Sequence, residues 1–141
     1  MWVRAPLCLL LVFGIGCTTS GSAPTKPRVL VPNPHFENPP GEYALSETNP
    51  VLVGSLPGRS LPAKERAFLD RLRGPDGQRV HYIRRGSCCF FPTPNGLFGE
   101  SALLDHYEVT YDGLAYPLSL YINMYDPGEV RAPLGFTLIE E

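Results

Sequence analysis

Prolines are the feature that most restricts how this chain can fold. Nine of its sixteen prolines fall between residues 18 and 62, where Ser, Thr, Gly and Asn fill much of the remaining sequence. A proline lacks a backbone N–H and biases the residue before it toward extended conformations. We therefore expect residues 17–48 to form a semi-extended tether and residues 49–141 to hold the folded domain.

The first sixteen residues have the composition of a signal peptide. Arg4 is the one charged side chain in this segment, and residues 7–15 are apolar apart from Gly14. A transmembrane helix needs roughly 17 to 25 apolar residues, whereas a signal peptide needs only about 7 to 15 before a small-residue cleavage site. We therefore expect residues 1–16 to be a lipoprotein signal peptide that is removed from the mature chain.

Cys17 follows this segment directly, after Gly14, Ile15 and Gly16. The arrangement resembles the lipobox of bacterial lipoproteins, in which the cysteine thiol receives a diacylglyceryl group and the chain is cut before that cysteine. Gly14 departs from the leucine that is usual three positions before the cysteine. The resemblance implies lipidation of Cys17, attachment to a membrane through that lipid, and, from Thr18, sorting to the outer membrane of a diderm host. Ordinary secretion with an unmodified Cys17 is the alternative.

Length and charge exclude several classes of protein. The chain has 141 residues and a formal net charge of −2. This length suits one small domain and excludes a barrel enzyme of roughly 250 residues. The nearly neutral balance gives no electrostatic case for nucleic acid, so we expect no nucleic-acid partner. The sequence has no GxSxG, HExxH or P-loop motif, and we expect no cofactor.

The residue pattern predicts an α+β domain, with one helix packed on a small, mostly antiparallel sheet. Ser60 and Pro62 mark the start of the helix, and Gly74 with Pro75 marks its end. Strand patterns occur at residues 51–53, 79–84, 105–111 and 118–125, the first as an edge strand. The predicted core consists of Phe68, Leu69, Leu72, Val109, Leu118, Leu120, Ile122 and Met124.

Two adjacent cysteines are the most unusual feature of the domain. With Cys17 lipidated, Cys88 and Cys89 would be the thiols left in a compartment that oxidises thiols. Three interpretations stay open: small residues that rigidify a turn, a vicinal disulfide that contacts a ligand, or a reactive thiol or soft-metal site with His81 or His106. Neighbouring strand residues point to opposite faces, and the pair lacks the CxxC spacing of zinc sites. We therefore expect no metal site.

Three sequence motifs occur in order along the domain. They are RGSCCFF at residues 85–91, LDHYEVTY at residues 104–111 and YINMYD at residues 121–126. Together they resemble a family of small bacterial envelope lipoproteins, across about residues 49–136. Members sometimes carry the label 2-dehydro-3-deoxyphosphooctonate aldolase, but that enzyme type is a cytosolic barrel of about twice this length. The resemblance therefore implies an envelope location and no established activity.

Two groups of side chains are candidate binding residues. Tyr121, Asn123 and Tyr125 would share one face of the last predicted strand, where aromatic rings beside an amide suit a sugar or a peptide. The same face could instead be covered by the helix or a loop. Arg84 and Arg85 could grip a carboxylate or a phosphate, or simply be solvated.

These patterns predict a non-catalytic binding or structural module of the cell envelope. Its expected partners are the membrane, through the lipid, and an envelope glycan or protein. The alternative is a small envelope enzyme or redox protein that acts through Cys88, Cys89 or Ser87, with a histidine and Asp105 as assisting groups.

Overall fold

The computed structural model describes residues 31–33, 41–54 and 59–140. The predicted signal peptide, Cys17 and most of the predicted tether lie outside these residues. Within the described ranges, no helix is both long enough and apolar enough to cross a membrane.

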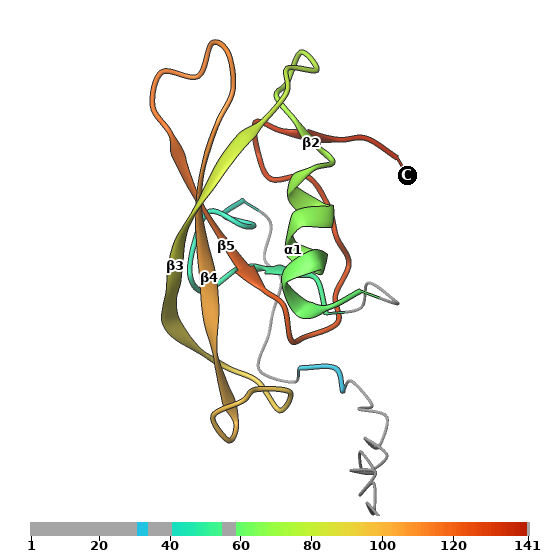
Figure 1. Ribbon diagram of the computed structural model, residues 1–141, viewed down its shortest axis with the longest axis vertical. Coiled ribbons are helices and arrows are strands. Elements are labelled where there is room, and N and C mark those ends of the chain that lie inside the picture. The colour runs from blue at the N-terminus through green and yellow to red at the C-terminus, as the bar shows by residue number, and fades with distance from the viewer. Residues whose placement is uncertain (1–30, 34–40, 55–58, 141) are drawn as a thin grey trace, which may run out of the picture.

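A four-stranded sheet with one helix against it forms the centre of the fold (Figure 1). The strands lie in the order β1 (Val51–Leu52), β5 (Leu118–Asn123), β4 (Ser101–Thr110) and β3 (His81–Pro92). β3, β4 and β5 pair antiparallel, and β1 runs parallel to β5 at one edge. The helix α1 (Leu61–Leu69) packs on one face of this sheet. One helix on a mostly antiparallel sheet agrees with the predicted fold class.

A small second sheet forms where the helix was expected to continue. α1 ends at Leu69, and Leu72 belongs to β2 (Leu72–Arg73), which pairs antiparallel with β6 (Thr137–Leu138). The apolar spacing of Phe68, Leu69 and Leu72 also suits a helix. Pairing with β6 keeps Leu72 extended and still buries it. The predicted last turn of the helix is therefore wrong.

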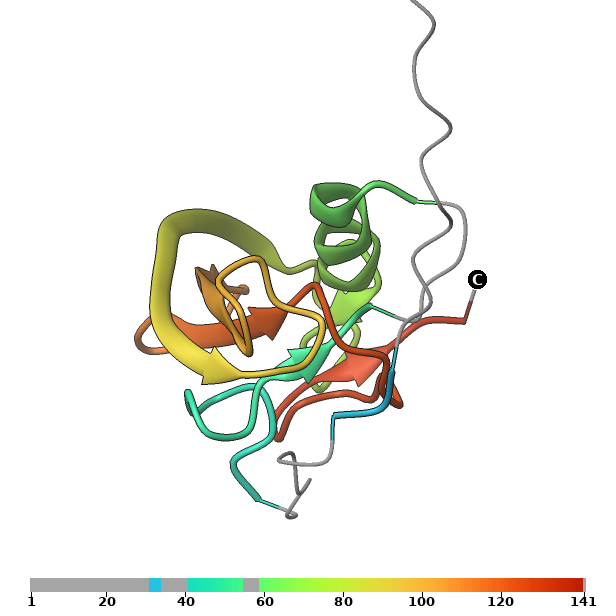
Figure 2. The same ribbon diagram turned by 90° about the horizontal axis from the view of Figure 1, so that it is seen from below.

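β3 extends well beyond the predicted strand at residues 79–84 and curves around the sheet (Figure 2). Two bulges interrupt its pairing with β4, one between Arg84 and Gly86 and one between Cys88 and Phe90. Each bulge region contains a residue of positive φ, Gly86 at 139° and Cys89 at 42°. A bulge inserts one extra residue and bends its strand. The bulges therefore interrupt the alternation of inward and outward side chains along β3. For this reason the sequence pattern predicts only the first part of the strand.

The hydrophobic core lies between α1 and the sheet, and all eight predicted core residues contribute to it. Leu118 and Met124 are partly buried against the cluster. The six predicted residues that are buried in full are Phe68, Leu69, Leu72, Val109, Leu120 and Ile122.

The folded domain begins before residue 49. Tyr43 and Ala44 are buried in the core, and the Ala44 carbonyl accepts a hydrogen bond of 2.8 Å from the Tyr121 N–H. Asn33 reaches the domain as well, through hydrogen bonds to the Pro92 carbonyl and to Asp126. The prediction that the tether extends to residue 48 is wrong at this end. Residues 41–48 contain no proline, and burial of Tyr43 offsets the entropy lost on ordering them.

Candidate functional site

A polar cluster lies between β3 and β4 on the side of the sheet that faces α1. Arg84 donates two hydrogen bonds to Asp105, from Nε to Oδ2 at 2.8 Å and from Nη2 to Oδ1 at 2.7 Å. Ser87 Oγ donates to Asp105 Oδ1 at 2.7 Å and accepts a hydrogen bond from Arg84. Strand residues separated by three positions normally point to opposite faces. The extra residue of the first bulge brings Arg84 and Ser87 to the same face.

Two buried carboxyl groups meet in this cluster and hold different protonation states. Burial and, to a lesser degree, the neighbouring Asp105 raise the pKa of Glu65 to about 8, although a 2.7 Å hydrogen bond from Tyr107 Oη opposes the shift. Burial alone would also raise the pKa of Asp105. Hydrogen bonds from Arg84 and Ser87 outweigh that effect and hold the Asp105 pKa below its usual value. At neutral pH Glu65 therefore keeps its proton and Asp105 is ionised.

This cluster does not give Ser87 the base that a nucleophile needs. The Ser87 hydroxyl donates to Asp105, whose lowered pKa makes the carboxylate a weak base. His106 lies on the opposite face of β4, where Nε2 is 2.9 Å from Ser119 Oγ. His81 lies at the far end of β3. The structure therefore does not assemble the serine, histidine and aspartate of the alternative enzyme hypothesis, and the cluster instead links β3, β4 and α1.

Cys88 and Cys89 form a disulfide between neighbouring residues. The bridge lies in the second bulge of β3, and both side chains are half-buried. With this bridge closed, neither sulfur is a free thiol. Across the part of the chain that the structure describes, no group of three or more His, Cys, Asp or Glu side chains could hold a metal ion.

The predicted tyrosine face is only partly present. Tyr121 is half-exposed, and its ring stacks on that of His106 with the centroids 5.2 Å apart. Asn123 is fully buried: its side-chain oxygen accepts hydrogen bonds from the N–H groups of Tyr125 and Asp126. Tyr125 is buried as well. Asn123 therefore offers no exposed amide to a ligand, unlike the predicted binding face, because β5 ends there and the side chain closes the turn that follows.

Arg84 and Arg85, the two predicted anion-binding residues, each face a carboxylate of the protein. Arg84 is paired with Asp105, and Arg85 Nη2 lies 2.6 Å from Glu108 Oε2. The two pairs lie on opposite faces of the sheet, because Glu108 and Asp105 are three positions apart on β4. Guanidinium groups that already hold a carboxylate have fewer donors left for an external anion.

A third buried acid, Asp126, is not among the residues predicted from the sequence to be functional. Four neutral side chains donate hydrogen bonds to its carboxylate: Thr93 and Asn95 to Oδ1, Asn33 and Asn123 to Oδ2. These donors come from three segments that are far apart in the sequence. The Asp126 cluster therefore fastens residues 31–33 and the β3–β4 loop to the turn after β5. The amide and acid of the YINMYD motif are the sequence signal that could have indicated it.

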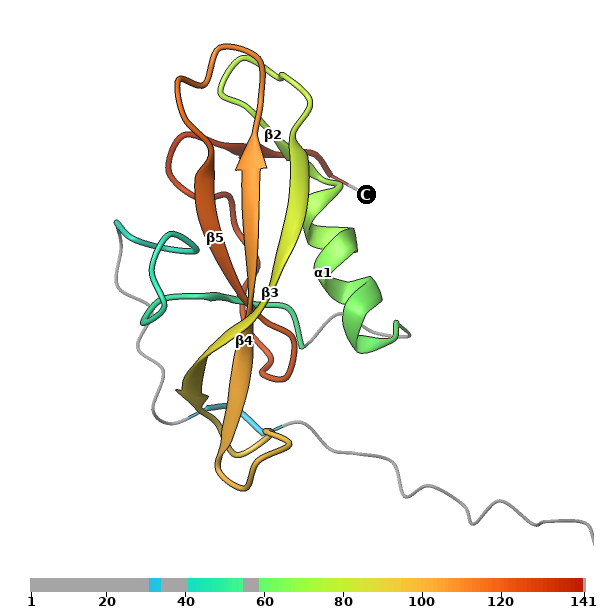
Figure 3. The same cartoon turned by 60° about the vertical axis from the view of Figure 1, so that its left-hand side comes forward.

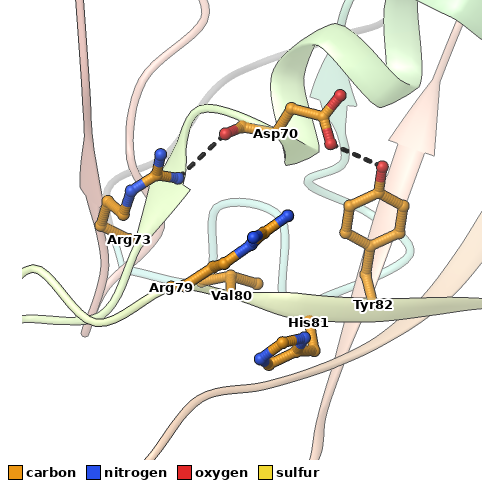
Figure 4. A pocket seen from close by; sticks show the side chains of 6 residues that line it. All are labelled: Asp70, Arg73, Arg79, Val80, His81 and Tyr82. Atoms are coloured by element: carbon orange, nitrogen blue, oxygen red, sulfur yellow. Dashed lines mark hydrogen bonds between the residues drawn. The ribbon is translucent and has the colours of Figure 1, made fainter.

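A concave site lies at the other end of the sheet, where the end of α1 meets the start of β3 (Figure 4). Tyr82 Oη donates to Asp70 Oδ1 at 2.7 Å, and Arg73 Nη1 donates to the Asp70 carbonyl at 2.9 Å. Burial and the hydrogen bond to Asp70 raise the pKa of Tyr82 to about 12, so its hydroxyl stays protonated. The pocket has a volume of about 560 Å³ and is lined by Asp70, Arg73, Arg79, Val80, His81 and Tyr82.

Arg79 is a side chain of this pocket whose guanidinium has all its donors to spare. Figure 4 shows its guanidinium between Arg73 and Tyr82. Toward the described residues, this group forms no hydrogen bond or ion pair. The lining also has a net positive charge, because it contains two arginines, Arg73 and Arg79, and one acid, Asp70. An arginine in this setting can hold a carboxylate or a phosphate through paired N–H donors.

No protein-family model, curated protein or solved structure matches this chain.

Proposed function

We propose that this chain is a lipid-anchored, non-catalytic binding protein of the bacterial cell envelope, and that the pocket around Arg79 binds an anionic group of an envelope glycan. The observation that carries the binding role is the Arg79 guanidinium, which faces an open pocket of about 560 Å³ without a hydrogen-bond acceptor from the described protein. A uronate or phosphate group supplies the acceptor oxygens that this guanidinium needs.

The envelope location is supported by the sequence at the N-terminus. A basic residue, a short apolar segment and a small residue precede Cys17, as in bacterial lipoproteins. The three domain motifs resemble those of small envelope lipoproteins. An acyl-modified Cys17 would attach the chain to a membrane, and Thr18 after it favours the outer membrane of a diderm host; replacing Cys17 by Ala should release the chain from the membrane fraction.

A binding role is favoured over catalysis by the state of the candidate nucleophiles. Ser87 is hydrogen-bonded to a weakly basic carboxylate, and Cys88 is joined to Cys89. An acyl-transfer or redox enzyme needs a nucleophile beside a base or a free, reactive thiol. Binding an anion in the pocket requires neither group, because the Arg79 N–H donors are already in place.

Titration with glucuronate tests the binding role. The probe is added to the chain from residue 17 onward, with Cys17 replaced by Ser, and amide chemical shifts are followed by NMR. We expect shifts at residues 79–82 with glucuronate and none with glucose, which has the same ring but no charge. Arg79→Gln should weaken binding about tenfold, which corresponds to about 1.4 kcal/mol.

Arg66→Gln is the matched control, since it removes the same charge from the exposed side of α1 outside the pocket lining. Equal losses in Arg79→Gln and Arg66→Gln would mean that net charge, and not the pocket, attracts the probe. Saturable binding of glucose at the same residues would also contradict the proposal.

A further inference from the structure

The end of β3, with Phe90, and the loop that joins β3 to β4, with Leu97 and Phe98, expose an unusual amount of apolar surface. Phe90, Leu97 and Phe98 are 72%, 63% and 56% exposed. The two phenylalanine rings are in contact, with their centroids 6.2 Å apart. Between residues 90 and 101 the sequence has a single charged side chain, Glu100. We call Phe90, Leu97 and Phe98 the aromatic tip.

The Asp126 cluster holds this loop in place. Thr93 and Asn95 are buried and donate hydrogen bonds to Asp126, so the loop cannot fold its apolar side chains inward without breaking them. Exposed aromatic side chains on a fixed support are costly in water. Such surface is typical of a site that meets an apolar partner.

The N-terminal segment enters the fold beside the aromatic tip. Asn95 accepts a 3.2 Å hydrogen bond from the Val31 N–H and donates one of 2.7 Å to the Val31 carbonyl. Asn33 donates to the Pro92 carbonyl at 2.6 Å. Figure 3 shows residues 31–33 next to the β3–β4 loop. Val31 is itself 50% exposed and adds to the apolar surface at this end.

Chain length identifies what the tip can reach. Fourteen residues lead from Cys17 to Val31, and they span at most about 50 Å when fully extended. A lipid on Cys17 would thus limit the distance between the membrane surface and Val31, beside the tip, so that the tip can reach the membrane. Aromatic and aliphatic side chains favour the boundary between headgroups and acyl chains.

We propose that the aromatic tip rests in the interfacial region of the membrane that holds the Cys17 lipid. This inference depends on the lipid anchor of the proposed function. The role of the aromatic tip is to orient the folded domain on the membrane, since acyl chains alone suffice for attachment. The Arg79 pocket lies at the opposite end of the sheet from the β3–β4 loop (Figure 1), so this orientation turns the pocket away from the membrane.

A single introduced tryptophan tests the contact. The only native tryptophan is Trp2, in the predicted signal peptide, so the mature chain has none. The lipidated Phe98→Trp protein is reconstituted in phosphatidylcholine vesicles with or without brominated acyl chains. We expect its emission to shift to shorter wavelength and to lose intensity with brominated lipid. Leu97→Trp repeats the test at a second exposed position.

Tyr116→Trp is the matched control, because Tyr116 is 80% exposed in the loop at the other end of β4. Its tryptophan should keep the emission of a solvated side chain in both kinds of vesicle. Quenching in Phe98→Trp and Leu97→Trp but not in Tyr116→Trp supports the proposal. Equal quenching at both ends, or none at either, overturns it.

Flotation of the vesicles separates this inference from the lipid anchor. Protein that floats with the vesicles while the tip tryptophan stays unquenched keeps the anchor and refutes membrane contact by the tip, leaving that surface to a protein partner. Protein that does not float refutes the anchor itself.

Discussion

The two ends of the sheet place charge and apolar surface in opposite ways. At the β3–β4 loop the Asp126 carboxylate is fully buried and the aromatic tip is outside. At the end of α1 the apolar side chains, such as Leu72, are inside and Arg79 and Asp70 are exposed. The same small fold thus presents an apolar surface at one end and a charged pocket at the other.

The difference shows what each kind of packing makes possible. A buried acid with four directional hydrogen bonds fixes a loop that has little apolar packing of its own. The apolar side chains of that loop are then free to face outward. At the pocket end the hydrophobic core fixes the backbone, so charged side chains are free for binding.

The largest expected effect comes from Asp126→Ala. This change removes the acceptor of three buried donors and of the half-buried Asn33, and we expect the free energy of unfolding to fall by about 3–5 kcal/mol in urea denaturation. Asp112→Ala is the control, because Asp112 is an exposed acid in the loop at the other end, and it should change stability by about 0.5 kcal/mol or less. Similar effects in the two variants would remove the contrast between the ends.

Glu65→Gln tests the buried acid pair that lies between the two ends. The native state holds a proton on Glu65 up to about pH 8, because its pKa is raised, whereas the unfolded chain releases it near 4.5. Since the native state binds more protons, stability should fall as pH rises from about 4.5 to 8. Glutamine keeps a neutral group that can donate to Asp105 and accept from Tyr107. We expect it to abolish this fall and to stabilise the protein at pH 8 by on the order of 1–3 kcal/mol.

Glu100→Gln is the control for this pH series, since Glu100 is exposed. Its stability profile should follow that of the wild type. If the free energy of unfolding of the wild type does not change between pH 5 and 8, then Glu65 is ionised in the folded protein. Its pKa would then not be raised to about 8.

Ser87→Ala asks whether this hydroxyl is structural. Loss of the hydrogen bond to Asp105 should lower the free energy of unfolding by about 1 kcal/mol, with glucuronate binding unchanged because the pocket lies elsewhere. Ser119→Ala, an exposed serine on the opposite face, should have a smaller effect. A Ser87→Ala protein of wild-type stability that loses an envelope activity would restore the enzyme alternative.

Reduction of the Cys88–Cys89 bridge should have the smallest effect. A bridge between neighbouring residues closes almost no loop, so it restricts the unfolded chain very little. We expect a thiol-free phosphine reductant to change the free energy of unfolding by about 0.5 kcal/mol or less. A loss of several times that size would assign the bridge a structural role in the aromatic tip, which it adjoins.

Parts of the fold with a regular hydrophobic period could be predicted from the sequence. The helix after Ser60, the strands that contain Val109 and Leu120, and the eight predicted core residues follow directly from such spacing, whereas core residues such as Tyr43 and Phe136 were not predicted. The end of α1 could not, because Leu72 is buried equally well in a helix or in a strand, and its partner Leu138 is distant in the sequence.

The polar sites were harder to predict, since their members come from separate segments. Glu65 lies on a helix and its carboxyl partner Asp105 lies on β4. The bulge that turns Ser87 toward Asp105 interrupts the alternation that a sequence pattern relies on. The sequence indicates that Arg84 and Arg85 bind anionic groups. It does not indicate that these groups are the carboxylates of Asp105 and Glu108.

The intact mass of the protein extracted from bacterial membranes tests the central claim most directly. A lipid-anchored envelope protein should lack residues 1–16, carry a diacylglyceryl group and an amide-linked acyl chain on Cys17, and be lighter by two hydrogens because Cys88 and Cys89 are joined. A product that retains Met1, has no acyl mass and carries four free thiols, from Cys8, Cys17, Cys88 and Cys89, would contradict a lipid-anchored envelope protein.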